Sequence, residues 1–484
     1  MSEVQITENI SEAANAASGS GGESSSSYAA QRLLRGVGAT ALYPIVTAVV
    51  QLVTVPVFLR FWGPRLYGEW LLLSTIPSYL ALSDMGFGSV AGNEMTMRVA
   101  AGDRTGALRS FQSAWAMICG ISGAIGTVTA GAVYLLPLRR WLNMSAMSPR
   151  EFDGVLLLLI IYALGTLQTT LAASGFRCDG NYASGTLLLN LFRLVEALGS
   201  AAAVAFGTSP LWVAAFLVVV RWSGQVLMCV VMKRRSPWIR WGWKDANAAS
   251  VRRMARPAFA FMAFPIGNAL SIQGLLLVVG TVLGPVAVAI FSTTRTLTRV
   301  GFMILETIRH SIWPELSIAF GGANWSYARK LHGKACQAAL LLCATAVLFL
   351  AVFGQRIYVF WTHRTLTFDP VLFRILLVVV FADSLWYASA AATLACNAHQ
   401  RIAGAFLVST AVSLVLACVS MSRLGLVGPA LALLAIDIPM TLYVLRSSLD
   451  VLQDTLPGFL HELFTAPNFR GLAAQIMGKE SCNT

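Results

Sequence analysis

Long apolar runs recur along this chain, and they constrain its fold more than any other feature. Of the 484 residues, 56% are hydrophobic and 12% are charged, which is about half the charged share of a soluble domain. About 20 apolar residues are enough to cross a bilayer as an α-helix. Strands of a membrane β-barrel would instead alternate between apolar and polar residues. The sequence therefore predicts an all-α, polytopic membrane protein.

The apolar runs predict about twelve transmembrane helices. We expect them at 36–60, 67–92, 111–137, 153–174, 183–206, 209–232, 257–281, 285–313, 335–354, 370–396, 401–420 and 425–446. The loops between them are short, so no soluble catalytic domain fits. The chain also has no Walker A motif, no HExxH motif and no Cys/His cluster with metal-ligand spacing. We therefore expect a protein that is not an enzyme and that holds no metal or cofactor.

Basic residues set the expected orientation, because cytoplasmic loops are enriched in Lys and Arg. An even number of spans leaves both termini on one side. Most of the 35 Lys and Arg residues fall in the segments that share a side with the N-terminus. We therefore expect both termini in the cytoplasm. Positive-inside loops also account for the net charge of +13 without nucleic acid.

The spans divide the chain into five segments. We expect a disordered, polar cytoplasmic tail at 1–30 and a six-helix lobe at 31–232. A basic cytoplasmic linker at 233–256 would lie along the membrane surface. A second six-helix lobe follows at 257–450, and then an amphipathic cytoplasmic tail at 451–484.

The two lobes carry traces of an internal duplication. When the sequence is shifted by 221 residues, Pro44-Ile45 meets Pro265-Ile266 and Gly63-Pro64 meets Gly284-Pro285. Each half holds six spans, so the halves have the same orientation. Parallel repeats of this kind place a substrate between two lobes. We expect a central cavity between them.

Five arginines fall inside the expected spans, namely Arg193, Arg221, Arg295, Arg299 and Arg309. A charge at the bilayer centre costs roughly 2.5–3.5 kcal/mol. These side chains must therefore face a wet cavity or an acidic partner. An arginine-lined cavity favours an anionic substrate, because the guanidinium fork matches phosphate oxygens.

Helical spacing groups these arginines with other polar residues. One stripe of the eighth span holds Ser292, Arg295, Arg299, Glu306, Arg309 and Trp313, and one face of the fifth holds Asn190, Arg193 and Glu196. The first span has a stripe of Tyr43, Thr47, Gln51 and Thr54. Arg193 could simply pair with Glu196, and Arg309 could snorkel to the surface. Arg295 and Arg299 have no acid between them, so we expect them to repel each other unless an anion bridges them.

The candidate substrate-binding residues are therefore Arg193, Arg221, Arg295, Arg299, Asn190 and Gln51. Acids within spans could carry a coupling ion, H⁺ or Na⁺. Our candidates are Glu196, Glu306 and Asp383. Asp84 is expected to cap or hinge a helix, and Asp437 could serve either role.

Several short motifs resemble a known family. They are Tyr67-Gly68 followed by Trp70, then Leu82-Ser83-Asp84-Met85-Gly86-Phe87-Gly88, Asn93-Glu94, Ala101-Gly102-Asp103, Phe291-Ser292-Thr293-Thr294-Arg295, Trp313-Pro314-Glu315-Leu316 and Phe320-Gly321. Over roughly residues 31–450 the chain resembles the polysaccharide transporters, or Wzx-type O-antigen flippases, of the multidrug/oligosaccharidyl-lipid/polysaccharide exporter superfamily.

The resemblance implies a two-lobed bacterial inner-membrane flippase that works by alternating access. It would move undecaprenyl-pyrophosphate-linked oligosaccharide to the periplasmic leaflet for O-antigen, capsule or exopolysaccharide synthesis, beside the polysaccharide polymerase and export machinery. A cation-coupled multidrug antiporter of the same superfamily is the alternative, although it would favour an acidic cavity. A peptidoglycan-precursor flippase would usually have more spans. The glycan, the coupling ion and the oligomeric state stay open.

Overall fold

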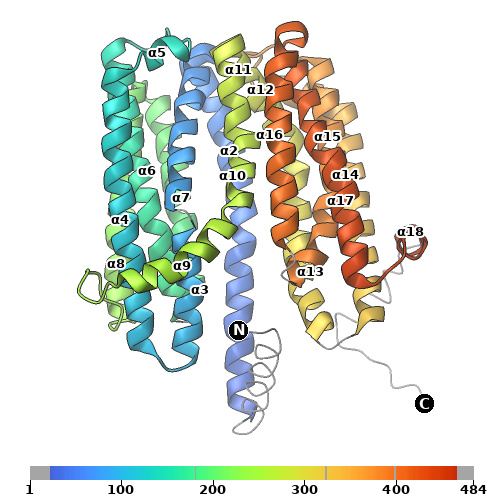
Figure 1. Cartoon of the computed structure of the whole chain (residues 1–484). Helices are drawn as coiled ribbons and strands as arrows, with labels where there is room; N and C mark the ends of the chain where they lie inside the picture. The colour runs from blue at the N-terminus through green and yellow to red at the C-terminus, as the bar shows by residue number, and fades with distance from the viewer. Residues whose placement is uncertain (1–21, 85, 180, 322–323, 397–398, 466–484) are drawn as a thin grey trace.

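The computed structural model describes residues 22–84, 86–179, 181–321, 324–396 and 399–465. Every regular element in these ranges is helical. The helices form two bundles that stand side by side, with the N-terminal half of the chain in one and most of the C-terminal half in the other (Figure 1). The protein is thus an all-α, polytopic membrane protein, as the apolar runs predicted.

The N-terminal lobe is built from α2 to α8. Its elements are α2 (Gly22–Leu80), the 3₁₀ turn η1 (Ala81–Asp84), α3 (Phe87–Ala100), α4 (Arg104–Leu135), the short α5 (Leu138–Trp141), α6 (Pro149–Cys178), α7 (Tyr182–Ala205) and α8 (Pro210–Arg235).

The second half begins with a surface helix and a broken span. Its elements are α9 (Ala248–Phe261), α10 (Ala263–Ala269), the π-turn η2 (Leu270–Gly274), α11 (Leu275–Leu283), α12 (Pro285–Thr298), the 3₁₀ turn η3 (Arg299–Gly301), α13 (Phe302–Gly321), α14 (Trp325–Trp361), α15 (Pro370–Ala395), α16 (His399–Leu424), α17 (Val427–Leu452) and α18 (Leu456–Phe464).

Ten helical stretches in the described residues are long and apolar enough to cross a membrane. The first of them, Val46–Leu80, holds two of the expected spans because the chain reverses within it at Gly63. The expected span 285–313 is not one helix: α12 ends at Thr298 and α13 begins at Phe302. Two expected spans are thus counted as one helix, and one expected span is divided into two helices that are not counted. This explains why ten long helices correspond to twelve expected spans.

Two glycine corners carry the clearest trace of the duplication. Gly63 has φ 72° and ψ 172°, and Gly284 has φ 86° and ψ 175°. Each corner is followed by a proline, whose fixed φ suits the first turn of a helix. A positive φ is strained for residues with a Cβ, so both corners favour glycine. The aligned Gly-Pro pairs of the two halves thus adopt nearly the same backbone conformation.

Three expected spans differ from continuous helices. The span 67–92 breaks where η1 and the left-handed Gly86 separate α2 from α3. The span 257–281 is divided at η2, and the span 285–313 is divided at η3. The stripe from Ser292 to Trp313 therefore does not lie on one straight helix, because the 3₁₀ turn at Arg299–Gly301 shifts the helical register.

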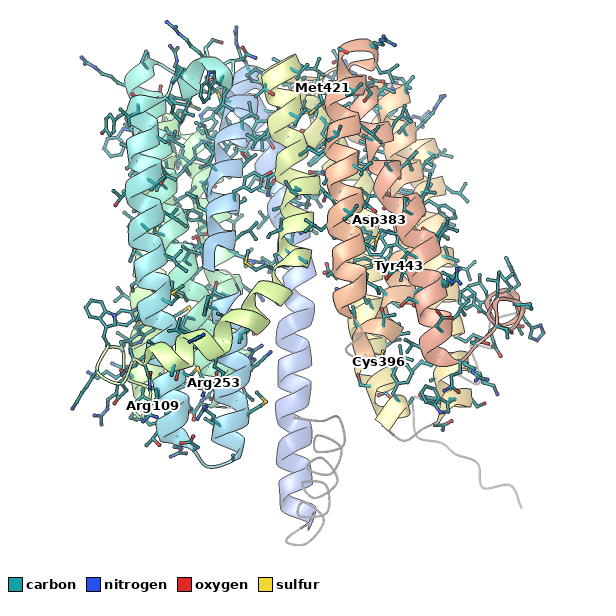
Figure 2. All side chains as sticks on the ribbon, viewed as in Figure 1. Arg109, Arg253, Asp383, Cys396, Met421 and Tyr443 are labelled. Atoms are coloured by element: carbon teal, nitrogen blue, oxygen red, sulfur yellow. The ribbon has the colours of Figure 1, made fainter. Side chains whose placement is uncertain are left out.

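The end of the segment expected to be disordered is helical, and the linker packs against the N-terminal lobe. Helix α2 already begins at Gly22, inside the segment expected to be disordered, while 1–21 and 466–484 lie outside the described residues. Helix α9 begins within the basic linker and crosses the lower part of the N-terminal lobe in the view of Figures 1 and 2. There Arg253 pairs with Glu94 at 2.7 Å, and Gln112 donates to the carbonyl of Arg240 at 3.0 Å. The linker is thereby fastened to the N-terminal lobe.

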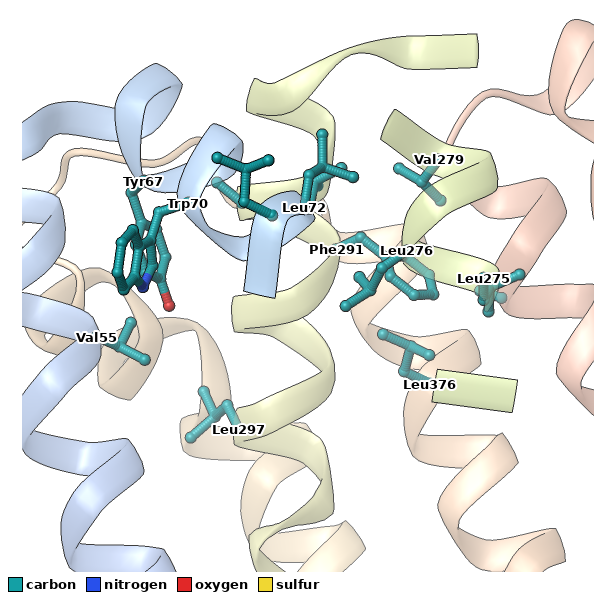
Figure 3. Close-up of a cluster of buried hydrophobic side chains, with 14 of the residues drawn as sticks. Val55, Tyr67, Trp70, Leu72, Leu275, Leu276, Val279, Phe291, Leu297 and Leu376 are labelled. Atoms are coloured by element: carbon teal, nitrogen blue, oxygen red, sulfur yellow. The ribbon is translucent and has the colours of Figure 1, made fainter. Parts of the chain in front are cut away.

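The lobes meet at the end that carries Gly63 and Gly284, called here the corner end. Buried side chains of α2, α11 and α12 share one apolar cluster there, including Leu72, Val279 and Phe291 (Figure 3). The backbones approach so closely that a Cβ on Gly68 would lie 1.9 Å from the carbonyl oxygen of Pro285. Asn143 also donates to the carbonyl of Thr281 across the lobes at 2.8 Å. The corner end is therefore closed by direct packing.

Enlarging Gly68 is predicted to separate the lobes at this end. In a chain carrying Asn143→Cys and Thr281→Cys, Gly68→Val should lower the yield of disulfide cross-linking, because the valine side chain collides with backbone that cannot move alone. Gly120→Val is the matched control, since nothing lies within 4 Å of a Cβ there. Equal cross-linking in all three chains would contradict the packing described.

Candidate functional site

A cavity of about 840 Å³ lies inside the N-terminal lobe, between α2, α6, α7 and α8. Its volume is in the upper part of the usual range for ligand pockets, ~300–1,000 Å³. Seryl and threonyl hydroxyls from α2, α6 and α7 line much of it, among them Thr54, Ser74 and Thr166. Phe58, Tyr67 and Trp70 line it as well. The lining thus combines hydroxyl groups with a larger apolar surface.

The charged groups of this cavity are unequal in sign. Arg177, Arg193 and Arg221 line it, and Glu196 is the one acid among its lining residues in the described part of the chain. Sequence reasoning placed Arg193, Arg221 and Glu196 at a site, and the structure brings these three together. It missed Arg177, because that residue falls at the end of an apolar run and was assigned to a loop. The lining carries a net formal charge of +2.

Glu196 forms an ion pair with Arg221 of the neighbouring helix α8. The Arg221 guanidinium lies 2.7 Å from Oε2 of Glu196 and also donates to the Tyr162 hydroxyl. That hydroxyl donates in turn to Oε2 of Glu196 at 3.1 Å, and the guanidinium stacks 4.7 Å from the Tyr162 ring centroid. Glu196, Tyr162 and Arg221 thus form a cluster from α6, α7 and α8, and Arg193 lies one turn from Glu196 on α7.

Tyr162 was missed because a tyrosine within an apolar run gives no periodic signal. The spacing along α7 was correct in placing Arg193 and Glu196 on one face. It could not show that Arg221 reaches the same point from α8. Contacts between helices, rather than spacing within one helix, decide which charges meet.

Two other candidates from the sequence lie apart from the cavity lining. Asn190 is buried on α7, and Gln51 is half-buried on α2, but neither is among the lining residues. The cavity is lined instead by Thr47 and Thr54 from the same polar stripe of α2. The stripe therefore faces the cavity along one edge only.

The C-terminal lobe holds a second group of charges. Arg295, only 7% exposed, donates to the carbonyl of Ser271 in η2 at 2.9 Å. Arg299 lies 3.4 Å from Asp383 of α15, and Trp386 donates to Asp437 of α17 at 3.2 Å. Neither arginine lines the N-terminal cavity.

Arg295 and Arg299 were expected to repel each other unless an anion bridges them. Their own stretch of chain offers no acid between them, but the chain itself supplies an anion, the Asp383 carboxylate, beside Arg299. It comes from a helix distant in sequence. Asp383, chosen as an ion-coupling candidate, is the partner of Arg299, and its role in coupling stays a prediction.

Glu306, the third coupling candidate, belongs to a separate cluster. Arg309 lies 3.7 Å from its carboxylate, and Tyr387 donates to it at 3.3 Å. The Arg309 guanidinium packs 4.6 Å from the Tyr387 ring centroid. Arg309 is thus held against α15 rather than extended to the surface. Within the described residues there is no group of three or more His, Cys, Asp or Glu side chains that could hold a metal ion.

Solved structures with this fold are membrane transporters. The chain aligns with an inward-facing multidrug-resistance MATE family transporter of the MOP superfamily at a TM-score of 0.72 and 14% identity, over 84% of this chain and 96% of the other. An outward-facing MATE structure aligns at 0.62 and 12% identity, over 86% and 95%. Neither a protein-family model nor a curated protein sequence matches the chain.

A third neighbour differs in the description of its pocket. It is a MOP superfamily transporter from Pyrococcus furiosus, described as having a binding pocket of reverse polarity that suggests a different function. It aligns at a TM-score of 0.55 and 12% identity, over 88% of this chain and 95% of the other. At these identities the likeness establishes the MATE-like fold alone.

Removal of Arg221 is predicted to destabilise the N-terminal lobe. The side chains of Arg221 and Glu196 are only 12% and 8% exposed, so Arg221→Leu leaves a buried carboxylate without its cation. Such a loss costs about 3–5 kcal/mol. The melting temperature of the purified protein should fall, and the double variant Arg221→Leu/Glu196→Leu should recover most of it. A single variant that melts like the parent would show that the pair is not buried as described.

Proposed function

We propose that this protein is a flippase for polyprenyl-pyrophosphate-linked oligosaccharide. The observation that carries the proposal is the excess of positive charge in the N-terminal cavity, with three arginines against one glutamate. Arginine forks bind phosphate oxygens in a bidentate manner. The many hydroxyl groups of the lining suit a substrate whose remaining part is a sugar.

The polarity of the cavity argues against export of organic cations. A cationic drug would meet three arginines in the lining, and Glu196, the one acid among the described lining residues, is paired with Arg221. The fold occurs in multidrug transporters, but substrate class depends on the residues of the site rather than on the fold. The fold is therefore compatible with the alternative, a multidrug antiporter, but the positive charge of the cavity lining argues against it.

Alternating access follows from how the lobes meet. They are packed together at the corner end by Gly68 and Pro285, and the chain is more similar to an inward-facing MATE structure than to an outward-facing one. If the basic linker lies on the cytoplasmic side, as the positive-inside rule predicts, the corner end faces the periplasm. Rocking of one lobe against the other would then open the corner end.

The proposed function implies a cellular location and partners for the protein. It would lie in the bacterial inner membrane with cytoplasmic termini and supply a lipid-linked repeat unit to a polysaccharide polymerase and export machinery. Translocation needs no bond to be made or broken. A proton or sodium ion carried by Glu196, Glu306 or Asp383 would give direction to transport.

Neutralising Arg193 is predicted to impair translocation of the lipid-linked oligosaccharide. In proteoliposomes, Arg193→Gln should slow translocation of a polyprenyl-pyrophosphate trisaccharide by roughly tenfold or more, the effect of losing one charged hydrogen bond. Arg193→Lys should restore only part of the rate, because lysine lacks the fork. Arg140→Gln, at an exposed arginine, is the control and should leave the rate unchanged.

Transport of organic cations by the same vesicles distinguishes the two candidate functions. The proposal predicts no uptake of a rhodamine or tetraalkylammonium cation above that of protein-free vesicles. Cation uptake without translocation of the lipid-linked trisaccharide would contradict the proposal and support the antiporter.

A further inference from the structure

The stretch of the basic linker at residues 236–247, called here the linker loop, is fastened to the side of α4. Gln112 of α4 donates to the carbonyl of Arg240 at 3.0 Å and accepts from the backbone N–H of Asp245 at 2.7 Å. The loop lies at the outer edge of the N-terminal lobe, on the side away from the C-terminal lobe (Figure 1). It therefore has a fixed position on the perimeter of the molecule.

Indole rings also join the linker loop to α4. The ring of Trp243 stacks on that of Trp115, with 5.5 Å between the centroids and 27° between the planes. Trp241 packs edge-on against Trp115 at 5.4 Å and against Phe111 at 4.9 Å. Trp241 is half-buried, whereas Trp243 is 65% exposed. Trp243 therefore presents an apolar ring to the surroundings of the lobe.

Two helices place these rings at one boundary of the bilayer. Trp115 and Leu135, the exposed last residue of α4, are twenty residues apart, which is about 30 Å of helix. Along α8, the exposed Trp212 and Lys233 are 21 residues apart, which is also about 30 Å. The hydrocarbon core of a bilayer is about 30 Å thick, and tryptophan is enriched at both of its interfaces. The linker loop therefore lies at the depth of the lipid headgroups.

Basic side chains gather at this end of the lobe. The exposed ones are Arg109 on α4, Lys233, Arg234 and Arg235 in the last turn of α8, and Arg240 and Lys244 in the linker loop. Arg109 lies one turn before Gln112, and so next to the point where the linker loop is fastened (Figure 2). Asp245 is the one acid between residues 233 and 247. The surface around Trp243 therefore carries an excess of positive charge.

Anionic phospholipids match both the depth and the charge of this surface. Each Lys or Arg close to an anionic membrane surface strengthens binding by roughly fivefold, and phosphate oxygens accept hydrogen bonds from both side chains. An exposed indole suits the boundary between headgroups and acyl chains. Val251 and Met254 of the following helix pack against the N-terminal lobe, so α9 leaves a basic side with Arg252 exposed. An acidic soluble protein would have to enter the headgroup layer to reach the linker loop.

We propose that the linker loop and the adjoining part of α4 form a binding surface for the headgroups of anionic phospholipids. Trp243 lies at the boundary with the acyl chains, and Arg109, Arg240 and Lys244 bind the phosphates. The surface is separate from the N-terminal cavity and does not depend on the proposed substrate. Lipid bound there anchors the chain where it passes from one lobe to the other.

Lipid titrations of the purified full-length protein test this surface. The protein in a neutral detergent is titrated with phosphatidylglycerol and with phosphatidylcholine of the same acyl chains, and bound lipid is counted by native mass spectrometry. The unchanged protein should bind phosphatidylglycerol roughly tenfold or more tightly than phosphatidylcholine. Arg240→Gln/Lys244→Gln should remove most of that preference, because two basic residues together account for roughly 25-fold.

Two variants serve as controls for charge and for place. Arg65→Gln/Arg140→Gln removes two exposed arginines from the corner end, and Arg193→Gln removes one from the N-terminal cavity. Both should keep the preference within about twofold, since neither change lies near the linker loop. Equal affinities of the unchanged protein for the two lipids would overturn the surface and leave the proposed function standing. Retention of the preference in Arg240→Gln/Lys244→Gln, or its loss in either control, would overturn it as well.

Discussion

The cost of placing charge inside an apolar bundle governs this structure. Each arginine of the interior must find an acid, a carbonyl, an aromatic face or water. Arg299 finds Asp383, Arg295 finds the carbonyl of Ser271, and Arg309 packs on Tyr387. In the N-terminal cavity Arg221 pairs with Glu196, and Arg177 and Arg193 line the same space. The excess of arginines over acids in the described lining is why we propose this cavity as the place for an anion.

The two lobes contain clusters of similar residues in different surroundings. Both contain Tyr, Glu and Arg side chains in contact, at Tyr162 in one lobe and Tyr387 in the other. The N-terminal cluster borders a large cavity. In the C-terminal lobe the contacts of Arg295, Arg299, Asp383 and Asp437 join the π-turn to helices α15 and α17. The two lobes thus share equivalent glycine corners but differ in the charged residues around the cavity.

The apolar runs and the Gly-Pro pairs predicted much of the fold. Apolar runs placed the spans because backbone in a bilayer must be helical, and the Gly-Pro pairs at Gly63 and Gly284 marked two equivalent corners. The hinge expected at Asp84 lies where η1 ends and α2 separates from α3. The breaks at η2 and η3 were not predicted, because tertiary contacts rather than apolar length decide where a buried helix changes register. For the site, Arg193, Arg221 and Glu196 were found from charge alone. Arg177, Tyr162 and the partner of Arg299 were not, since each depends on which helices become neighbours.

The central claim is that an anionic headgroup binds in the N-terminal cavity, and an experimental structure of the complex tests it most directly. The protein would be purified in lipid nanodiscs, saturated with undecaprenyl-pyrophosphate trisaccharide and imaged by electron cryomicroscopy. The account predicts phosphate density within hydrogen-bond distance of Arg193, with glycan density elsewhere in the same cavity. Phosphate density beside Arg299 in the C-terminal lobe, with the N-terminal cavity empty, would contradict it.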